Sequence, residues 1–295
     1  MRWQNRRQSS NVEDRRGLTG RKLAVGGGLG GLVVVVLYLL LGGNLGDEVP
    51  DLQLSTQTDS PTESRPLTAE EQEAGKFVSV ILADTEDVWK MLFNQQGKSY
   101  LEPQLVLFTD LTSSGCGAAR SASGPFYCPA DGKVYIDLGF FAEMQQRLNA
   151  PGDFAMAYVI AHEVGHHVQN QLGIMEKVMS KRSQMSEREF NQLSVRLELQ
   201  ADFLAGVWAH HAQRMQNIIE EGDVEEGINA AGAVGDDRIQ RMTQGYVVPD
   251  AFTHGTSGQR VSWFLKGFKT GDLSQGDTFT ADDPESEPEA AEFFT

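Results

Sequence analysis

The chain has 295 residues, with 41 Asp and Glu against 25 Lys and Arg, so its formal net charge at pH 7 is −16. An acidic chain repels nucleic-acid phosphates and anionic lipid headgroups, so a nucleic-acid-binding function is disfavoured. The length suffices for one domain of ordinary size with further segments at its ends.

The N-terminal part predicts attachment to a membrane. Residues 1–22 form a basic segment with seven Lys or Arg and two acidic residues, and residues 23–41 are 19 uncharged, mostly apolar residues. Such a stretch can span a bilayer as one helix, and the positive-inside rule keeps its basic flank in the cytoplasm. Residues 42–66, rich in Gly, Ser, Thr, Asp and Pro, are predicted to be a flexible linker. We therefore expect a single-pass membrane protein with an extracytoplasmic domain, periplasmic or extracellular; a cleaved signal peptide is the alternative.

The folded body is predicted to be one α+β domain over residues 67–280. Thr68 and Glu71 form a capping box that opens its first helix. Residues 281–295 are acidic, contain two prolines early on and offer little to bury, so this tail is predicted to be disordered.

Two strands are predicted ahead of the long helices, at residues 104–108 and 133–137, and a short helix at residues 139–148. An edge strand can hold an extended peptide by main-chain hydrogen bonds. Either residues 124–127 or residues 133–137 could be that edge, and the sequence does not choose between them.

Cys116 and Cys128 are the two cysteines of the chain, and both lie in one Gly/Ser/Ala-rich loop. In an oxidising compartment they are predicted to form a disulfide, which in the entropic account stabilises by about 3 kcal/mol for a loop of this size. Two free thiols are the alternative. The cysteines lack the C-x-x-C spacing of a zinc knuckle, so a purely structural zinc site is poorly supported.

The motif His162-Glu163-Val164-Gly165-His166 lies within a predicted helix that Asp153 is expected to cap and Gly173 to end. Residues four apart share one face of a helix, so both imidazoles can bind one metal ion. Glu163 then lies where it can act as the general base of a zinc hydrolase. The alternative is an ordinary amphipathic helix in which the histidines occur by chance.

A catalytic zinc needs a third protein ligand, and a second long helix offers one. Glu198 and Asp202 are four residues apart, so both face the same way. Glu198 is predicted to bind the metal, while Asp202 accepts a hydrogen bond from a ligand histidine and fixes its orientation. A solvated acidic helix face is the alternative. His210 and His211 lie further along the same helix, roughly 18 Å along its axis from Glu198, and are predicted to be structural.

These features resemble those of the bacterial neutral zinc metallopeptidases, membrane-anchored members of the zincin class whose third ligand is a glutamate. The resemblance covers about residues 67–280 and rests on the segments Gly124–Asp131, Val134–Asp137, His162–His166, Glu198–Asp202 and Phe252–Ser257. It implies a zincin-like fold, one zinc held by His162, His166 and Glu198, and a catalytic Glu163. A peptide or protein is the substrate that this family implies.

The predicted chemistry is amide hydrolysis by a zinc-activated water with Glu163 as general base. A donor is also needed for the oxyanion of the tetrahedral intermediate. His254, in a loop just before a helix, is the candidate, with Arg260 and Tyr158 as alternatives; a structural role for His254 at the helix entry remains open. Zinc is the expected metal, although this ligand set accepts other divalent ions.

Two other functions share the same residues. The domain could bind zinc and act as a tethered interaction module, although a scaffold has no need of Glu163 beside an open metal position. It could also hydrolyse other amides, such as those of cell-wall peptides. The sequence does not separate these functions, because loops shape the substrate pocket.

Overall fold

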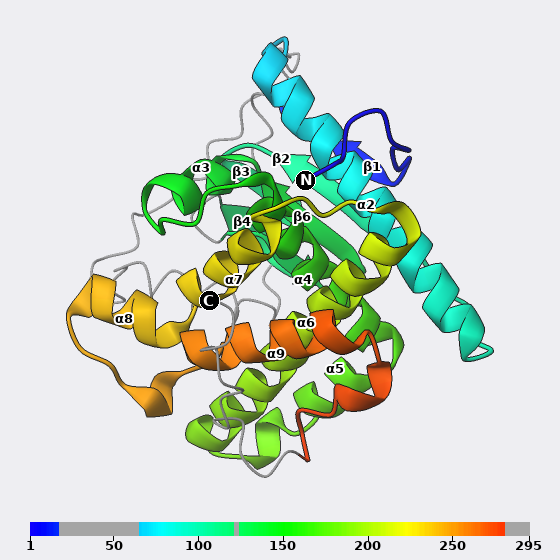
Figure 1. Ribbon diagram of the computed structural model, residues 1–295. Coiled ribbons are helices and arrows are strands. Elements are labelled where there is room, and N and C mark those ends of the chain that lie inside the picture. The colour runs from blue at the N-terminus through cyan, green and yellow to red at the C-terminus, as the bar shows by residue number, and fades with distance from the viewer. Residues whose placement is uncertain (18–64, 121–123, 281–295) are drawn as a thin grey trace, which may run out of the picture.

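The computed structural model describes residues 1–17, 65–120 and 124–280, and shows a mixed α+β fold around a small sheet (Figure 1). The sheet has the strand order β1–β2–β6–β5. Its strands are β1 (Val12–Asp14), β2 (Gln104–Phe108), β6 (Lys133–Asp137) and β5 (Phe126–Cys128). β1, β2 and β6 run parallel, whereas β5 runs antiparallel to β6 at the edge. A separate hairpin consists of β3 (Leu111–Ser114) and β4 (Gly117–Arg120).

The central helix is α4 (Asp153–Gln171), which contacts β5 and β6 of the sheet as well as several other helices. Those helices are α2 (Ala69–Gln95), α5 (Ile174–Met179), α6 (Glu187–Gln216) and α7 (Asp223–Ala233). The other α-helices of the described residues are α3 (Gly139–Gln146), α8 (Asp236–Gln244) and α9 (Ser257–Thr270). Of the 19 residues of α4, 15 are buried, so the motif histidines belong to an interior helix and not to an ordinary surface helix.

Most predicted elements are confirmed, with small changes at their ends. β2 and β6 have the predicted bounds, and the capping box of Thr68 and Glu71 opens α2. The prediction that Asp153 caps α4 is wrong, because Gly152 occupies the N-cap position. Glu226 of α7 takes over the capping role, since its carboxylate accepts the backbone N–H of Phe154 at 3.0 Å.

Helices α6 and α9 make the most extensive contact in the fold, and two glycines let them approach each other. A Cβ atom on Gly206 of α6 would lie 2.1 Å from the carbonyl oxygen of Phe264. A Cβ atom on Gly267 of α9 would lie 2.1 Å from the carbonyl oxygen of Phe203. The backbones can therefore pack this closely only with glycine at both positions, and this contact fixes α9 against the helix that carries Glu198.

The first 17 residues are part of the folded body, where they lie alongside α2 (Figure 1). β1 extends the sheet beside β2, and arginines of the segment reach acidic residues of α2. Arg6 forms an ion pair with Asp84 at 2.6 Å, and Arg7 with Glu86 at 3.0 Å. Asp84 and Glu86 are 2% and 1% exposed, so the arginines supply positive charge to carboxylates that are buried from water.

This packing corrects the predicted boundary of the folded body. Residues 1–22 were expected to form a cytoplasmic segment apart from the domain, but residues 1–17 pack against it. The segments predicted as a transmembrane helix (23–41) and an acidic tail (281–295), and the linker up to residue 64, lie outside the described residues. Within the described part of the chain, no helix is both long and apolar enough to cross a membrane.

Cys116 and Cys128 form the predicted disulfide, with their Cα atoms 5.8 Å apart. The bond joins the turn of the β3–β4 hairpin to the last residue of β5. It therefore tethers the hairpin to the edge strand of the sheet.

Candidate active site

Helices α4 and α6 bring three metal-ligating side chains together. His162 and His166 lie one turn apart on α4, and Glu198 faces them from α6. The Nε2 atom of His162 lies 3.2 Å from Glu198 Oε2, and Nε2 of His166 lies 3.4 Å from Glu198 Oε1. One ligand atom from each residue lies within 4.8 Å of the others. The three side chains predicted as ligands thus converge on one point.

Asp202 holds His162 from the side opposite Glu198. The Nδ1 atom of His162 lies 2.9 Å from Asp202 Oδ1, and Arg260 donates to the two carboxylate oxygens from Nε at 2.8 Å and from Nη2 at 3.0 Å. The hydroxyl of Tyr158 donates to Asp202 as well. Asp202 is fully buried, so this network holds His162 Nδ1 and turns Nε2 toward Glu198, where a metal would replace the Nε2 proton.

Charges around the site keep both carboxylates ionised. Burial raises the pKa of Asp202, but the charges of Arg260 and His162 outweigh it and lower the pKa. Burial also raises the pKa of Glu198, and the charge of His166 with hydrogen bonds from both histidines holds it well below its ordinary value. For His162, burial lowers the pKa, yet Asp202 and Glu198 raise it to about 9. The site is therefore arranged to attract a cation.

Gln169 orients His166 as Asp202 orients His162, and this role of Gln169 was not predicted from the sequence. The Nδ1 atom of His166 lies 2.9 Å from Gln169 Oε1. Gln169 is fully buried, and its Nε2 donates to the carbonyl oxygen of Leu197 at 2.7 Å and to Gln200 Oε1 at 3.1 Å. Because residues three apart share a helix face, the spacing of His166 and Gln169 is the signal that could have identified this partner.

The three potential ligands and Glu163 line one cavity of about 260 Å³. The edge strand β5 lines it too, whereas β6 lies inside the sheet between β2 and β5. Of the two candidate edges, the structure therefore selects the segment at β5. Much of the remaining wall is apolar and includes Val159, Met175, Met179, Leu197, Ile239 and Met242.

His254 lines the same cavity, and Asp236 fixes its position. Asp236 Oδ2 accepts the backbone N–H of His254 at 2.6 Å, and Oδ1 lies 3.1 Å from His254 Nδ1. The backbone N–H groups of Thr253 and Gly255 also donate to Asp236, at 2.7 and 3.0 Å. Burial lowers the pKa of His254, but the charge of Asp236 outweighs it and raises the pKa. Asp236 was not among the site residues predicted from the sequence.

The alternatives to His254 are engaged elsewhere. Arg260 uses Nε and Nη2 for Asp202, and its Nη1 donates to the carbonyl oxygen of Val234 at 3.2 Å. The Tyr158 hydroxyl donates to the same carboxylate. Both side chains therefore hold Asp202, the partner of His162, whereas among the described residues Nε2 of His254 has no hydrogen-bond partner.

His210 and His211 lie away from the site, as predicted. Nδ1 of His210 is 2.8 Å from the carbonyl oxygen of Phe268, and Nε2 of His211 is 2.9 Å from that of Gly271. These carbonyls belong to the C-terminal end of α9, so both histidines satisfy unpaired helix-end acceptors.

The chain resembles known proteins along most of its length. The sequence pattern of the family described as "Putative neutral zinc metallopeptidase" matches residues 1–279. The chain belongs to this family. The uncharacterized protein YpfJ of Escherichia coli (strain K12) is 51% identical over 286 residues, which are 95% of this chain and 99% of that protein. The uncharacterized protein Rv2575 of Mycobacterium tuberculosis (strain H37Rv) is 40% identical over 225 residues, covering 72% of this chain and 74% of that protein.

No solved structure gives a significant match to the chain. The predicted membership of the metallopeptidase family is confirmed, and the family match begins at residue 1. The N-terminal segment that packs on α2 and β2 is thus included in the family's sequence pattern.

Proposed function

We propose that this protein is a zinc-dependent peptidase with a zincin-like active site, in which His162, His166 and Glu198 hold one zinc ion and Glu163 is the general base. The observation that carries the proposal is the convergence of the two Nε2 atoms and one carboxylate, 3.2 and 3.4 Å apart. Each histidine has its other ring nitrogen held, by Asp202 and by Gln169. Such outer partners are characteristic of metal sites.

The donor set fits a catalytic zinc better than a structural one. Zinc bonds of about 2.0–2.2 Å in a tetrahedral arrangement place ligand atoms roughly 3.3–3.6 Å apart, close to the separations found here. Structural zinc sites use four protein ligands, usually with cysteines, whereas catalytic sites use three and leave one position open. Both cysteines of this chain are joined in a disulfide. When bound, zinc would lower the pKa of a water molecule to about 7 and polarise the scissile carbonyl.

The remaining steps fall to side chains of the cavity. Glu163, which is 8% exposed, accepts the proton of the attacking water and delivers it to the leaving amine nitrogen. His254, whose Nδ1 is held by Asp236, donates a hydrogen bond from Nε2 to the developing oxyanion when its ring is protonated. The substrate lies extended along β5, the edge strand of the sheet among the described residues, which can offer main-chain hydrogen bonds beside the metal ligands.

Attachment to a membrane through residues 23–41 also remains a proposal. A disulfide between Cys116 and Cys128 favours an oxidising, extracytoplasmic compartment for the domain. A single span at residues 23–41 would put residues 1–17 and the domain on opposite sides of the membrane, so the anchored protein would lack the packing of residues 1–17 on α2 and β2. Separation of membranes at high pH, which strips peripheral proteins, tests this: full-length protein in the pellet supports the anchor, and release into the supernatant contradicts it.

The test of the proposed activity is the cleavage of an unstructured protein by the full chain, wild type beside Glu163→Gln. Both are first shown to hold equal zinc. Gln matches Glu in size but cannot accept the proton, so we expect cleavage by the wild type and none by Glu163→Gln. Equal cleavage by both would contradict the proposal. Absence of cleavage by either, with zinc bound, would favour a zinc-binding interaction module or a non-peptide amide as substrate.

A further inference from the structure

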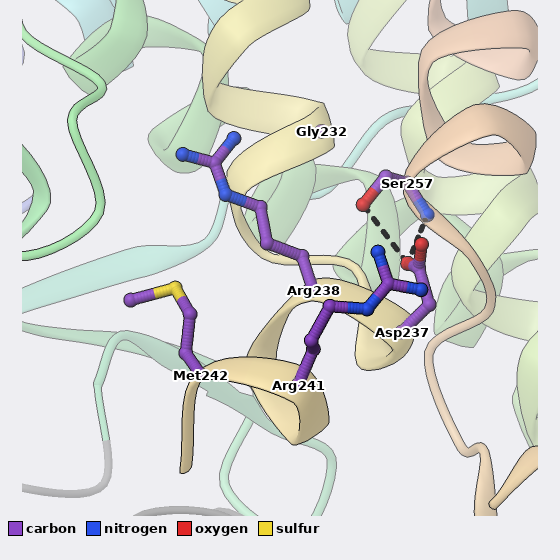
Figure 2. A pocket seen from close by; sticks show the side chains of 6 residues that line it. All are labelled: Gly232, Asp237, Arg238, Arg241, Met242 and Ser257. Atoms are coloured by element: carbon purple, nitrogen blue, oxygen red, sulfur yellow. Dashed lines mark hydrogen bonds between the residues drawn. The ribbon is translucent and has the colours of Figure 1, made fainter. Parts of the chain in front are cut away.

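A second cavity, of about 360 Å³, lies beside α8 and contains two arginines (Figure 2). Its lining residues are Gly232, Asp237, Arg238, Arg241, Met242 and Ser257. Figure 2 shows the side chains of Arg238, Arg241 and Met242 projecting from α8. Two cations in one cavity are notable in a chain whose net charge is −16. This cavity is not part of the metal site described above.

Contacts within the cavity leave a net positive charge. Arg238 is half-buried, and its Nη2 donates to the carbonyl oxygen of Leu148 at 2.8 Å, which orients the guanidinium. Asp237 is the one acidic residue of the lining, and its Oδ1 accepts from the backbone N–H and the hydroxyl of Ser257 at 2.7 and 2.9 Å. Among the described residues neither Arg238 nor Arg241 forms an ion pair with a carboxylate. The cavity can therefore accept an anionic group.

Helix α8 connects this cavity with the metal cavity. Met242 lines both, while Ile239 and Thr243 on the adjoining face of α8 line the metal cavity. Met242 is 55% exposed and lines both cavities, so the two cavities adjoin at its side chain. A chain bound beside the metal ligands that continues past Met242 brings its next polar group to the arginines.

We propose that Arg238 and Arg241 bind a carboxylate of the peptide substrate, a specificity that rests on the proposed peptidase function. Guanidinium groups match a carboxylate with paired, charge-assisted hydrogen bonds, which an amide of the same shape cannot replace. The preferred substrate places an apolar side chain in the metal cavity and a carboxylate further along the chain, on the α8 side. That carboxylate is either an Asp or Glu side chain or the C-terminus of the peptide.

The test compares quenched fluorescent peptides that differ only by Glu or Gln, with the substitution moved through the positions on each side of the cleaved bond. At one position we expect kcat/KM for the Glu peptide to exceed that for the Gln peptide about tenfold. This ratio is modest for a hydrogen bond between charged groups, because Arg241 is exposed and water weakens the interaction. Gln peptides with a free or an amidated C-terminus distinguish the second source: a preference for the free acid assigns the site to the terminal carboxylate.

Arg241→Gln is the decisive variant, since Arg241 is exposed and its loss leaves the fold intact. It should bring the Glu-to-Gln ratio close to one. Arg147→Gln is the matched control, because Arg147 lines the metal cavity but is paired with Glu143 at 3.1 Å; it should retain the preference. The proposal is overturned if the wild type cuts charged and neutral peptides equally, both in the Glu and Gln comparison and in the comparison of free and amidated C-termini. It is also overturned if Arg241→Gln keeps the preference for the carboxylate peptide.

A failure of the peptidase proposal can be told apart from a failure of this one. Zinc-loaded Glu163→Gln protein binds peptide without cutting it, and fluorescence anisotropy measures its affinity for the same peptides. If Glu163→Gln protein binds the carboxylate peptide more tightly than the neutral peptide, and the double variant with Arg241→Gln does not, the anion site is supported even when no peptide is cleaved. Equal affinity for all peptides refutes it whatever the cleavage assay shows.

Discussion

Replacing Asp202 with Asn should weaken zinc binding and, separately, destabilise the fold. Asp202 accepts from His162 Nδ1 at 2.9 Å and from Arg260 Nε at 2.8 Å. Asn keeps one oxygen acceptor and no charge, so it cannot serve both partners. Loss of an outer partner of a ligand histidine weakens metal affinity by about 10–100-fold, or about 1.4–2.7 kcal/mol. Arg260 has a side chain 4% exposed, and leaving such a buried cation unpaired costs about 3–5 kcal/mol of unfolding free energy.

A second variant separates these two effects. Asp202→Asn combined with Arg260→Gln removes both buried charges, so the free energy of unfolding of the metal-free protein should recover in part. The zinc Kd should stay raised, because His162 still lacks its anionic partner. Urea unfolding gives the first quantity, and competition with a chromophoric chelator gives the second. A single Asp202→Asn variant that binds zinc as tightly as the wild type would refute the positioning role of Asp202.

Other predictions concern packing, charge and pH. Gly206→Ala should lower the free energy of unfolding by about 3 kcal/mol, because the added Cβ would lie 2.1 Å from a backbone oxygen. Gly232→Ala is the control, because the nearest atom to its Cβ is 3.5 Å away. Urea unfolding should show no loss of unfolding free energy in that variant. Arg6→Ala should destabilise by about 3 kcal/mol because it leaves a buried carboxylate unpaired. Burial raises the pKa of Asp84 to about 7, so this loss should be larger at pH 8 than at pH 6, and equal losses would contradict the ion pair. Burial lowers the pKa of His254, but the negative charge of Asp236 has the larger effect, so the pKa of His254 in the folded protein lies above its ordinary value of 6.5. The ion pair of His254 with Asp236 therefore stabilises the fold fully below pH 6.5, and this stabilisation is lost as the pH rises through the folded-state pKa. The melting temperature of Asp236→Asn should accordingly fall less than that of the wild type between pH 6.5 and 9, and parallel curves would count against the pair.

The local part of the active site could be predicted from the sequence. His162 with His166 and Glu198 with Asp202 each have the spacing of four that places side chains on one helix face. Capping boxes are equally local: that of Thr68 was predicted, and a second one at Ser186 opens α6. These signals depend on neighbouring residues, so they need no knowledge of how the helices pack.

The contacts between distant segments could not be predicted in this way. Asp236 meets His254 from another helix, and nothing in the spacing of the two residues indicates the contact. β1 is three residues long and pairs with a strand about ninety residues further along the chain. Its neighbouring arginines were interpreted by the positive-inside rule, although Arg6 and Arg7 neutralise carboxylates of α2. The basic charge was visible in the sequence, but the buried acidic partners were not.

The central claim is that one zinc ion at His162, His166 and Glu198 supports peptide hydrolysis with Glu163 as base. The most direct measurement is the cleavage rate of an unstructured protein as zinc is titrated into metal-free wild type and Glu163→Gln, with bound zinc measured in parallel. The rate of the wild type should rise in proportion to bound zinc and level off at one zinc per chain, while Glu163→Gln binds the same zinc without activity. Cleavage by the metal-free wild type, or equal rates for both proteins at full zinc occupancy, would contradict the account.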